Sequence, residues 1–214
     1  MSGAAPSMGL RELVESRLRG TRPGGDPLAA LAAELSPAQL DELRRHLPEP
    51  LTPAAVMVPL VDRPEGMTVL LTQRASHLKA HPGQISFPGG RVEELDAGPW
   101  EAALREAREE IGLAPGYASL VGYLADHLVL TGFRITPAVA IVRPGFELAL
   151  DLTEVEDVFE VPLSFVLDPS NRIARERMYS GHAFRTWDIP WGRRHIWGAT
   201  AGMLLSLYRL LREE

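Results

Sequence analysis

The stretch that most constrains this chain is residues 87–113, where a Gly-Gly turn, an acidic loop and a helical pattern follow one another. Pro99 suits a first helical position, because its fixed φ fits a helix and its missing N–H would lack a partner there. Gly112 suits the left-handed residue just past a helix end. The segment therefore predicts a helix that begins at Pro99 and ends just before Gly112.

The predicted helix has an apolar side and an acidic side when its residues are placed about 100° apart. The apolar side consists of Trp100, Ala103, Leu104, Ala107 and Ile111. The adjacent arc carries Glu106, Glu109 and Glu110, at positions i, i+3 and i+4. Three carboxylates this close repel one another, and a divalent cation would reverse that repulsion. Because oxygen-only ligands favour Mg²⁺ or Mn²⁺, the acids predict a metal site.

The same acids have a second interpretation, which is a solvated helix face held by ion pairs. Arg105 and Glu109 have the i,i+4 spacing of such a pair. The Gly-Gly turn, the closing glycine and the apolar side favour the metal site, because a solvated face alone needs none of them.

At these residues the chain resembles the Nudix hydrolases. The box of that family is Gly, five residues, Glu, seven residues, Arg-Glu, an apolar residue, any residue, Glu-Glu, any residue, Gly and an apolar residue. Its second half is matched by Arg105, Glu106, Ala107, Glu109, Glu110, Gly112 and Leu113. In the first half, Asp96 stands six positions after Gly90 in place of Glu, and its gap to Arg105 is one residue longer. Asp96 and Glu94 are therefore both candidates for the role of the first acid.

The resemblance implies an α+β fold with a mixed β-sheet sandwiched between helices. It also implies an enzyme, a hydrolase that cleaves the diphosphate of a nucleoside-diphosphate-linked substrate with Mg²⁺ or Mn²⁺. It assigns metal binding to Glu106 and Glu110, with Glu109 as a third ligand or the general base. Arg105 would orient a carboxylate through a charged hydrogen bond, so we expect Glu109, Arg105 and Glu106 to be catalytic.

A second resemblance lies just upstream, in residues 70–90. The coenzyme A diphosphatase branch of the Nudix family has Leu-Leu-Thr, any residue, Arg, Ser or Ala, three residues, Arg, three residues, Gly, three residues and Phe-Pro-Gly-Gly. Every fixed position matches except one, because Lys79 stands where the signature has Arg. Shorter matches to this branch lie at residues 132–137, 161–163 and 196–200.

This signature implies that the substrate is coenzyme A or an acyl ester of it, cleaved to 3′,5′-ADP and 4′-phosphopantetheine. Arg74 and Lys79 are candidate substrate contacts, although lysine lacks the bidentate fork of arginine. Gly89 and Gly90 would let the backbone approach the substrate and the acids closely. Taken alone, Arg74 could instead pair with a carboxylate of the sheet, and Lys79 could simply be solvated.

Two other functions stay open. ADP-ribose or a dinucleotide such as NADH could be the substrate, or the chain could be a non-catalytic module that binds a nucleotide metabolite. The upstream signature favours coenzyme A over the first, and the three acids argue against the second, because a binding module does not need them. We expect Trp187, Trp191 and Trp197 to be core or interface residues rather than a base-stacking platform.

Composition limits the partners. The 214 residues carry a formal net charge of −6, which argues against a broad nucleic-acid footprint, since that requires a basic surface. There is no cysteine, and no stretch approaches about 18 uninterrupted apolar residues. The N-terminal residues are charged where a signal peptide is apolar. We therefore expect a cytoplasmic protein with a small-molecule substrate and neither a nucleic-acid nor a membrane partner, and we leave a homodimer open.

Hydrophobic patterning divides the chain into an N-terminal helical extension, residues 1–50, and a Nudix hydrolase domain, residues 51–214. Besides the central helix, we expect helices at residues 10–18, 28–35, 37–47, 155–159, 163–167 and 196–211. We expect strands at residues 55–61, 67–72, 118–124, 135–142 and 181–187.

Overall fold

The structure is a computed structural model, and it describes residues 9–25, 27, 37–129, 131–179 and 182–212. The helices in this part of the chain are α1 (Leu10–Leu18), α3 (Pro37–His46), α4 (Pro99–Ile111), α5 (Leu163–Leu167) and α6 (Gly198–Arg212). The strands are β1 (Thr52–Val61), β2 (Thr68–Arg74), β3 (Ile85–Ser86), β4 (Gly89–Arg91), β5 (Ala118–Tyr123), β6 (His127–Val129), β7 (Phe133–Val142), β8 (Val155–Pro162), β9 (Ile173–Tyr179), β10 (His182–Trp191) and β11 (Arg194–Ile196).

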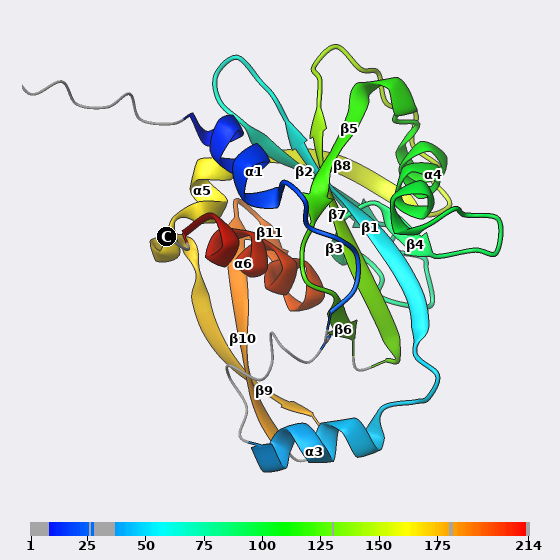
Figure 1. Cartoon of the computed structure of the whole chain (residues 1–214), viewed down its shortest axis with the longest axis vertical. Coiled ribbons are helices and arrows are strands. Elements are labelled where there is room, and N and C mark those ends of the chain that lie inside the picture. Colours follow the sequence, from blue (N-terminus) through cyan, green and yellow to red (C-terminus); the bar gives the residue numbers. More distant parts are fainter. Residues whose placement is uncertain (1–8, 26, 28–36, 130, 180–181, 213–214) are drawn as a thin grey trace, which may run out of the picture.

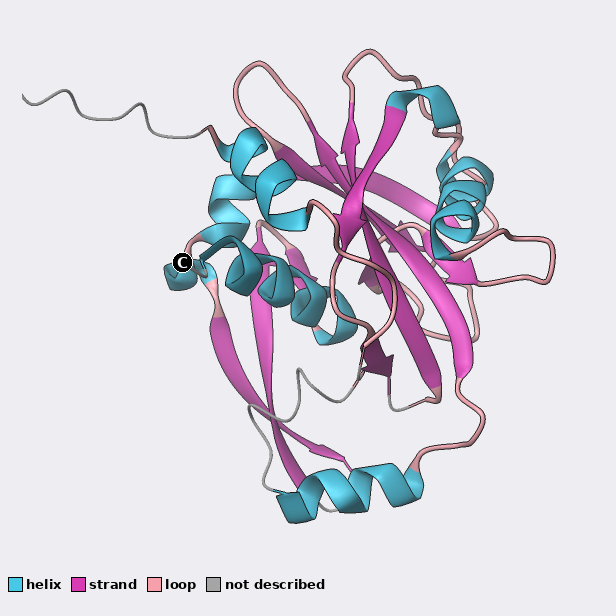
Figure 2. Cartoon of the chain, viewed as in Figure 1, coloured by secondary structure: helices cyan, strands magenta, loops and turns pink. Residues whose placement is uncertain are grey.

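Strands β1 to β8 form one mixed sheet, with the order β3-β2-β1-β7-β5 along its main path. Strands β1 and β7 run parallel over their whole length, and the other described pairs in this sheet are antiparallel. Strand β4 adds to β1, β6 adds to β7 and β8 adds to β2. A second sheet has the order β11-β10-β9, and Figure 2 shows β9 and β10 as a long hairpin beside α6.

Alternate residues of the central strands face two separate cores. Val56, Val58 and Leu60 of β1 pack into the core that contains residues of α1 and α6. Ala55 and Met57 of the same strand pack into the core beneath α4. Figure 1 shows α1 and α6 on one side of the sheet and α4 on the other. The predicted α+β fold, a mixed sheet sandwiched between helices, is confirmed.

Helix α4 begins at Pro99 and ends at Ile111, as the capping residues predict. Gly112 adopts φ 70°, and its N–H returns to the carbonyl oxygens of the last turn. The fully buried apolar residues of α4 are Ala102, Ala103, Ala107 and Ile111, whereas Trp100 and Leu104 of the predicted apolar side are only partly buried. The small alanines let α4 lie close against the sheet, so its polar residues are held near β4.

The short strands β3, β4, β6 and β11 were not predicted, and two longer strands also differ from the sequence prediction. The helix predicted at residues 155–159 is wrong, because these residues belong to β8, which pairs with β2 along its length. Strand β9 was not predicted, because its sequence IARERMY has three consecutive charged residues at its centre and so lacks the alternation of a half-buried strand. Pairing with a neighbouring strand decides both cases, and that pairing is not visible locally. The helix predicted at residues 28–35 lies outside the described residues.

Helix α1 packs on the sheet beside β5 and α6. Val14 and Leu18 are fully buried, and the Tyr123 N–H donates to the Thr21 hydroxyl at 2.7 Å. A Cβ on Gly122 would lie 2.3 Å from the Leu18 carbonyl oxygen, so glycine is required for this close approach. The boundary at residue 50 stays a prediction, but α1 shares the core of the sheet.

We expect Leu18→Ala to lower the free energy of unfolding by about 2–5 kcal/mol, because it leaves a cavity in a fully buried site. Chemical denaturation of wild type and variant measures the difference. Ser16→Ala, at an exposed position of the same helix, is the matched control and should change little. Equal effects of the two substitutions would show that α1 does not contribute to the core in solution.

Candidate active site

Strand β4 brings the Gly-Gly turn against the acids of α4. The Gly89 N–H donates to the Glu110 carboxylate at 3.1 Å. A Cβ on Gly90 would lie only 2.3 Å from a carboxylate oxygen of Glu106, so this side chain occupies the space above the bare glycine. The structure thus brings four of the predicted site residues together, and the absence of side chains at Gly89 and Gly90 is what allows the contact.

The three helix acids are not equivalent. Glu110 is buried with 5% of its surface exposed, whereas the Glu106 and Glu109 side chains are 16% and 59% exposed. Burial raises the pKa of Glu110 to about 8 and also raises the pKa of Glu106, because it disfavours the charged forms. The spacing along the helix places the acids on one arc, but burial separates them into two inward residues and one outward residue.

Arg105 connects the outward acid to the loop that precedes α4. Its guanidinium donates to both oxygens of Asp96, at 3.0 and 3.1 Å, and to Glu106 and Glu109, at 3.0 Å each. Hydrogen bonds from Arg105 hold the pKa of Asp96 below its usual range. Of the two candidates for the first acid of the box, Asp96 accepts hydrogen bonds from Arg105, whereas Glu94 is exposed in the loop.

The donor groups fit a hard divalent cation in their chemistry. Glu106 and Glu110 offer only oxygen atoms, and a positive ion beside them would favour the charged forms that burial disfavours. Within the described residues, no three acidic or histidine side chains converge as a ready metal cage. Arg105 instead holds Glu106 and Glu109.

The two cations of the upstream signature lie in different surroundings. Arg74 ends β2, and its charge lies close enough to lower the pKa of Glu110 against the larger effect of burial. Lys79 is exposed in the loop between β2 and β3 and has no hydrogen bond or ion pair to a described residue. Of the two cations, Arg74 therefore lies near the acids, whereas Lys79 lies in the exposed loop that follows.

Glu154 is a site residue that the sequence did not reveal. Its charge acts on both Glu106 and Glu110 and raises the pKa of each, although burial is the larger cause. The Ala75 N–H donates to its carbonyl oxygen at 2.8 Å, which fixes the residue beside the end of β2. The wrong helix at residues 155–159 concealed this position, and a strand prediction there would have placed it next to Arg74.

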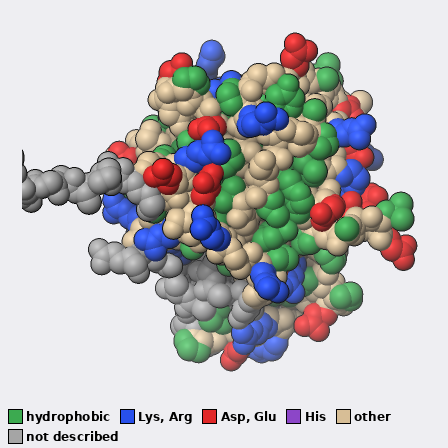
Figure 3. Space-filling view, turned by 45° about the horizontal axis from the view of Figure 1, so that its top comes forward, with side chains coloured by type: hydrophobic (Ala, Val, Ile, Leu, Met, Phe, Trp, Pro, Cys, Tyr) green, Lys and Arg blue, Asp and Glu red, His purple; other side chains and the backbone are tan. Residues whose placement is uncertain are grey.

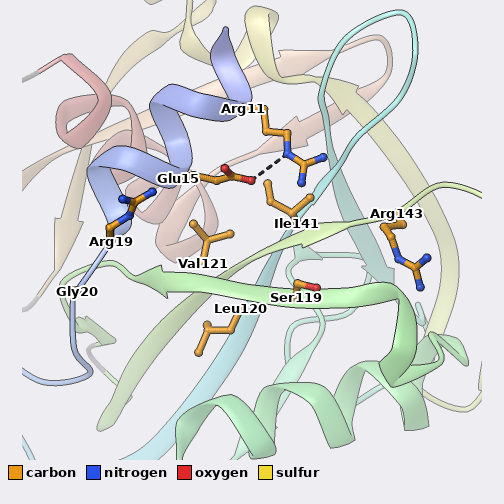
Figure 4. A pocket seen from close by; sticks show the side chains of 9 residues that line it. All are labelled: Arg11, Glu15, Arg19, Gly20, Ser119, Leu120, Val121, Ile141 and Arg143. Atoms are coloured by element: carbon orange, nitrogen blue, oxygen red, sulfur yellow. Dashed lines mark hydrogen bonds and ion pairs between the residues drawn. The ribbon is translucent and has the colours of Figure 1, made fainter. Parts of the chain in front are cut away.

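Two of the pockets formed by the described residues lie near the elements discussed above. The pocket on the outer side of α4 has a volume of about 540 Å³ and is lined by Glu101, Leu104, Arg105, Arg108, Glu109 and Pro115. The other, of about 360 Å³, lies between α1 and β5, and Figure 4 shows that its arginines do not converge on one point. Arg11 there pairs with Glu15 and Asp62, and Arg143 donates to the Gly116 carbonyl. Of these two pockets, the one beside α4 is therefore the one that includes a helix acid, because Arg105 and Glu109 line it.

The surface agrees with a small-molecule site. Figure 3 shows acidic and basic side chains interspersed over the visible face, without one continuous basic stripe. Among the helices of the described residues, none has the length and apolar character needed to span a membrane.

A mixed sheet between helices, with a Gly-Gly strand against an Arg-Glu-rich helix, is the arrangement expected of a Nudix hydrolase. The NUDIX domain model matches residues 51–180. The uncharacterized Nudix hydrolase NudL of Enterobacter sp. (strain 638) is 43% identical over 155 residues, which are 72% of this chain and 80% of that protein. The NudL of Escherichia coli (strain K12) is 39% identical over the same shares. The chain belongs to the Nudix family of hydrolases.

Solved structures support the fold alone. The MutT/nudix family protein from Enterococcus faecalis aligns with a TM-score of 0.50 at 16% identity, covering 86% of this chain and 71% of that one. At this identity the similarity concerns the arrangement of sheet and helices and does not extend to a substrate.

Proposed function

We propose that this protein hydrolyses the diphosphate bond of coenzyme A, or of its acyl esters, to 3′,5′-ADP and 4′-phosphopantetheine. The observation that carries the proposal is the signature in residues 70–90, in which Arg74 lies beside Glu110 and the two last glycines lie against Glu110 and Glu106. One continuous segment therefore offers cations for phosphates and borders the acids that would serve the hydrolysis. A cytoplasmic location and a homodimer stay predictions.

Glu106 and Glu110 would hold Mg²⁺ or Mn²⁺, with Glu109 or Glu154 as a further ligand. When bound, such a cation acidifies the attacking water and neutralises charge that develops on the phosphoryl oxygens. Whichever of Glu109 and Glu154 is not a ligand is suited to be the general base, because both are exposed and can accept the proton of that water.

The remaining residues bind and orient. Arg74 and Lys79 would contact oxygens of the diphosphate, with Lys79 as a point charge rather than a fork. Arg105 keeps Glu106 and Glu109 in place through its hydrogen bonds and is itself held by Asp96. The bare backbone of Gly89 and Gly90 leaves room for the acids next to β4. Water then attacks one phosphorus, and the bond from this phosphorus to the bridging oxygen breaks.

A substrate panel tests this proposal. Coenzyme A, ADP-ribose, NADH and diadenosine compounds are incubated with Mg²⁺ or Mn²⁺, and the products are identified by mass. We expect kcat/KM for coenzyme A to exceed that for each of the others at least about tenfold, and EDTA to stop the reaction. A higher kcat/KM for ADP-ribose or NADH would assign the alternative substrates. Tight binding of coenzyme A without any product would favour a non-catalytic binding module.

A further inference from the structure

One face of the second sheet carries charged and aromatic side chains that the reaction above does not use. Across antiparallel strands, residues directly opposite one another point to the same face. The register of β9 and β10 places Ile173 opposite Asp188, so Asp188 shares a face with Arg175 and Arg177. Both arginines lie near this carboxylate, with N–O distances of 3.4 Å for Arg175 and 3.3 Å for Arg177. We call these three residues and Trp197 the hairpin cluster.

The hairpin cluster has a positive charge in excess, and it combines two exposed guanidinium groups with a partly buried indole ring. The guanidinium carbon of Arg177 lies over the Trp197 ring, 4.4 Å from its centroid. The Arg175 and Arg177 side chains are 55% and 45% exposed, whereas Asp188 is buried. One carboxylate cannot saturate two guanidinium groups, each of which has five N–H donors. An anion that also carries a flat ring would find both kinds of contact here.

The cluster adjoins the signature segment. Trp197 immediately precedes α6, and a Cβ on Gly198 would lie 3.9 Å from the side-chain amide of Gln84. The Arg74 N–H donates to the Gln84 carbonyl oxygen at 2.9 Å. Trp197 is therefore next to the turn that closes the loop beginning at Arg74, and the charge of Arg74 acts on the buried Glu110 of α4.

We propose that the hairpin cluster is the subsite for the adenosine end of the substrate, an inference that rests on the proposed function. The adenine ring stacks on the plane of Arg177 and Trp197, since bases stack on guanidinium and indole planes alike. The phosphate on the ribose accepts N–H groups from Arg175, a charge-assisted contact. Arg74 and Lys79 then hold the diphosphate between this subsite and the acids. Trp197 takes part in binding, where the sequence alone favoured a core or interface role.

The same hairpin offers a matched control on its opposite face. Arg185 lies over the ring of Trp187, 5.0 Å from its centroid. In the register, Trp187 stands opposite Ala174 and Arg185 opposite Glu176, one residue out of phase with the hairpin cluster. Arg177→Ala and Arg185→Ala therefore remove the same kind of cation–π pair from two faces of one hairpin. Arg177→Ala also removes one of the two ion pairs of Asp188, and the pair with Arg175 remains.

The kinetic test compares coenzyme A hydrolysis by wild type and the two variants. Arg177→Ala should raise KM about ten- to a hundredfold, the effect of losing one base-stacking contact, and should leave kcat within about threefold. Arg185→Ala should leave both constants within about twofold of wild type. With Arg175→Ala, the preference for coenzyme A over 3′-dephospho-coenzyme A should shrink. Equal KM values for coenzyme A in Arg177→Ala and Arg185→Ala would overturn the proposal.

A binding test separates this proposal from the proposed reaction. Calorimetric titration with 3′,5′-ADP in EDTA needs no turnover, and its Kd should weaken at least about tenfold in Arg177→Ala and not in Arg185→Ala. If wild type does not cleave coenzyme A but this difference in Kd appears, the reaction is wrong and the subsite stands. If coenzyme A is cleaved but 3′,5′-ADP binds both variants equally, or does not bind wild type, the subsite is wrong.

Discussion

Glu110→Gln is expected to reduce kcat/KM for the metal-dependent reaction at least a hundredfold while the protein stays folded. Glu110 is buried, and its oxygen accepts a hydrogen bond from the Gly89 N–H that a glutamine oxygen can also accept. The substitution removes one negative charge from a site for a hard cation, which weakens metal binding and catalysis by orders of magnitude. The measurement is turnover as a function of Mg²⁺ concentration, with circular dichroism as the check on folding. Near wild-type rates at low millimolar Mg²⁺ would remove Glu110 from the metal site.

The same substitution should stabilise the metal-free protein at alkaline pH. Burial raises the pKa of Glu110 in the folded state from 4.5 to about 8. Between these values the unfolded chain has lost the proton and the folded protein still binds it, so wild-type stability falls as pH rises. Glutamine has no proton to lose. In EDTA, Glu110→Gln should therefore unfold at a higher temperature than wild type at pH 8 and at a similar one at pH 4.5. The exposed Glu109→Gln is the control, and equal gains from both would contradict the assigned burial.

Gly89→Ala is expected to lower the free energy of unfolding by about 3 kcal/mol or more. Gly89 adopts φ 156°, a conformation that side chains disfavour, and an added Cβ would lie 2.4 Å from the Ala55 carbonyl oxygen. It would also lie 2.6 Å from the Cα of Val56. Both atoms belong to the backbone of β1, which cannot move without disturbing the centre of the sheet. Denaturant titration of the purified variant measures the loss.

Substitution of the neighbouring glycine, Gly90→Ala, should affect the active site without affecting the stability of the fold. The three atoms nearest to its Cβ would all belong to the carboxylate end of Glu106, at 2.3 to 2.9 Å, and this flexible end can turn away. Stability should therefore change by no more than about 1 kcal/mol, whereas turnover should drop at least about tenfold because a proposed metal ligand is displaced. Full activity of Gly90→Ala would show that Glu106 does not need its present position. If Gly89→Ala were as stable as Gly90→Ala, the close approach of Gly89 to the backbone of β1 would be refuted.

Local signals were sufficient to predict the central helix. Pro99 and Gly112 mark its ends through their own backbone preferences, and these preferences do not depend on the rest of the chain. The spacing of the acids was equally local, so their common arc was predictable. Their unequal burial was not, because it depends on where β4 passes α4. The hydrogen bond from Gly89 to Glu110 joins residues 21 positions apart, and only the folded sheet creates it.

Features that depend on strand pairing were missed or misassigned. The valines and acids of β8 have a spacing that is compatible with a helix, and pairing with β2 overrides it. The three consecutive charged residues of β9 do not indicate a strand with a buried face, yet pairing with β10 makes this segment a strand. Glu154 and the hairpin cluster depend on these two strands, so neither could be placed from the sequence. The departure at Asp96 was visible, but its contact with Arg105 depends on the path of the loop.

The packing of α1 has a consequence for the order in which the chain can fold during synthesis. Thr21 and its partner Tyr123 are 102 positions apart, and α6, the other neighbour of α1, ends only at Arg212. A growing chain thus carries Val14 and Leu18 without their partners until the sheet and α6 have been made. Contacts of such long range form slowly and leave apolar surface exposed in the meantime. Helix α1, the first described helix to leave the ribosome, is therefore among the last to pack in its final place. Incomplete chains that lack α6 should depend on chaperones.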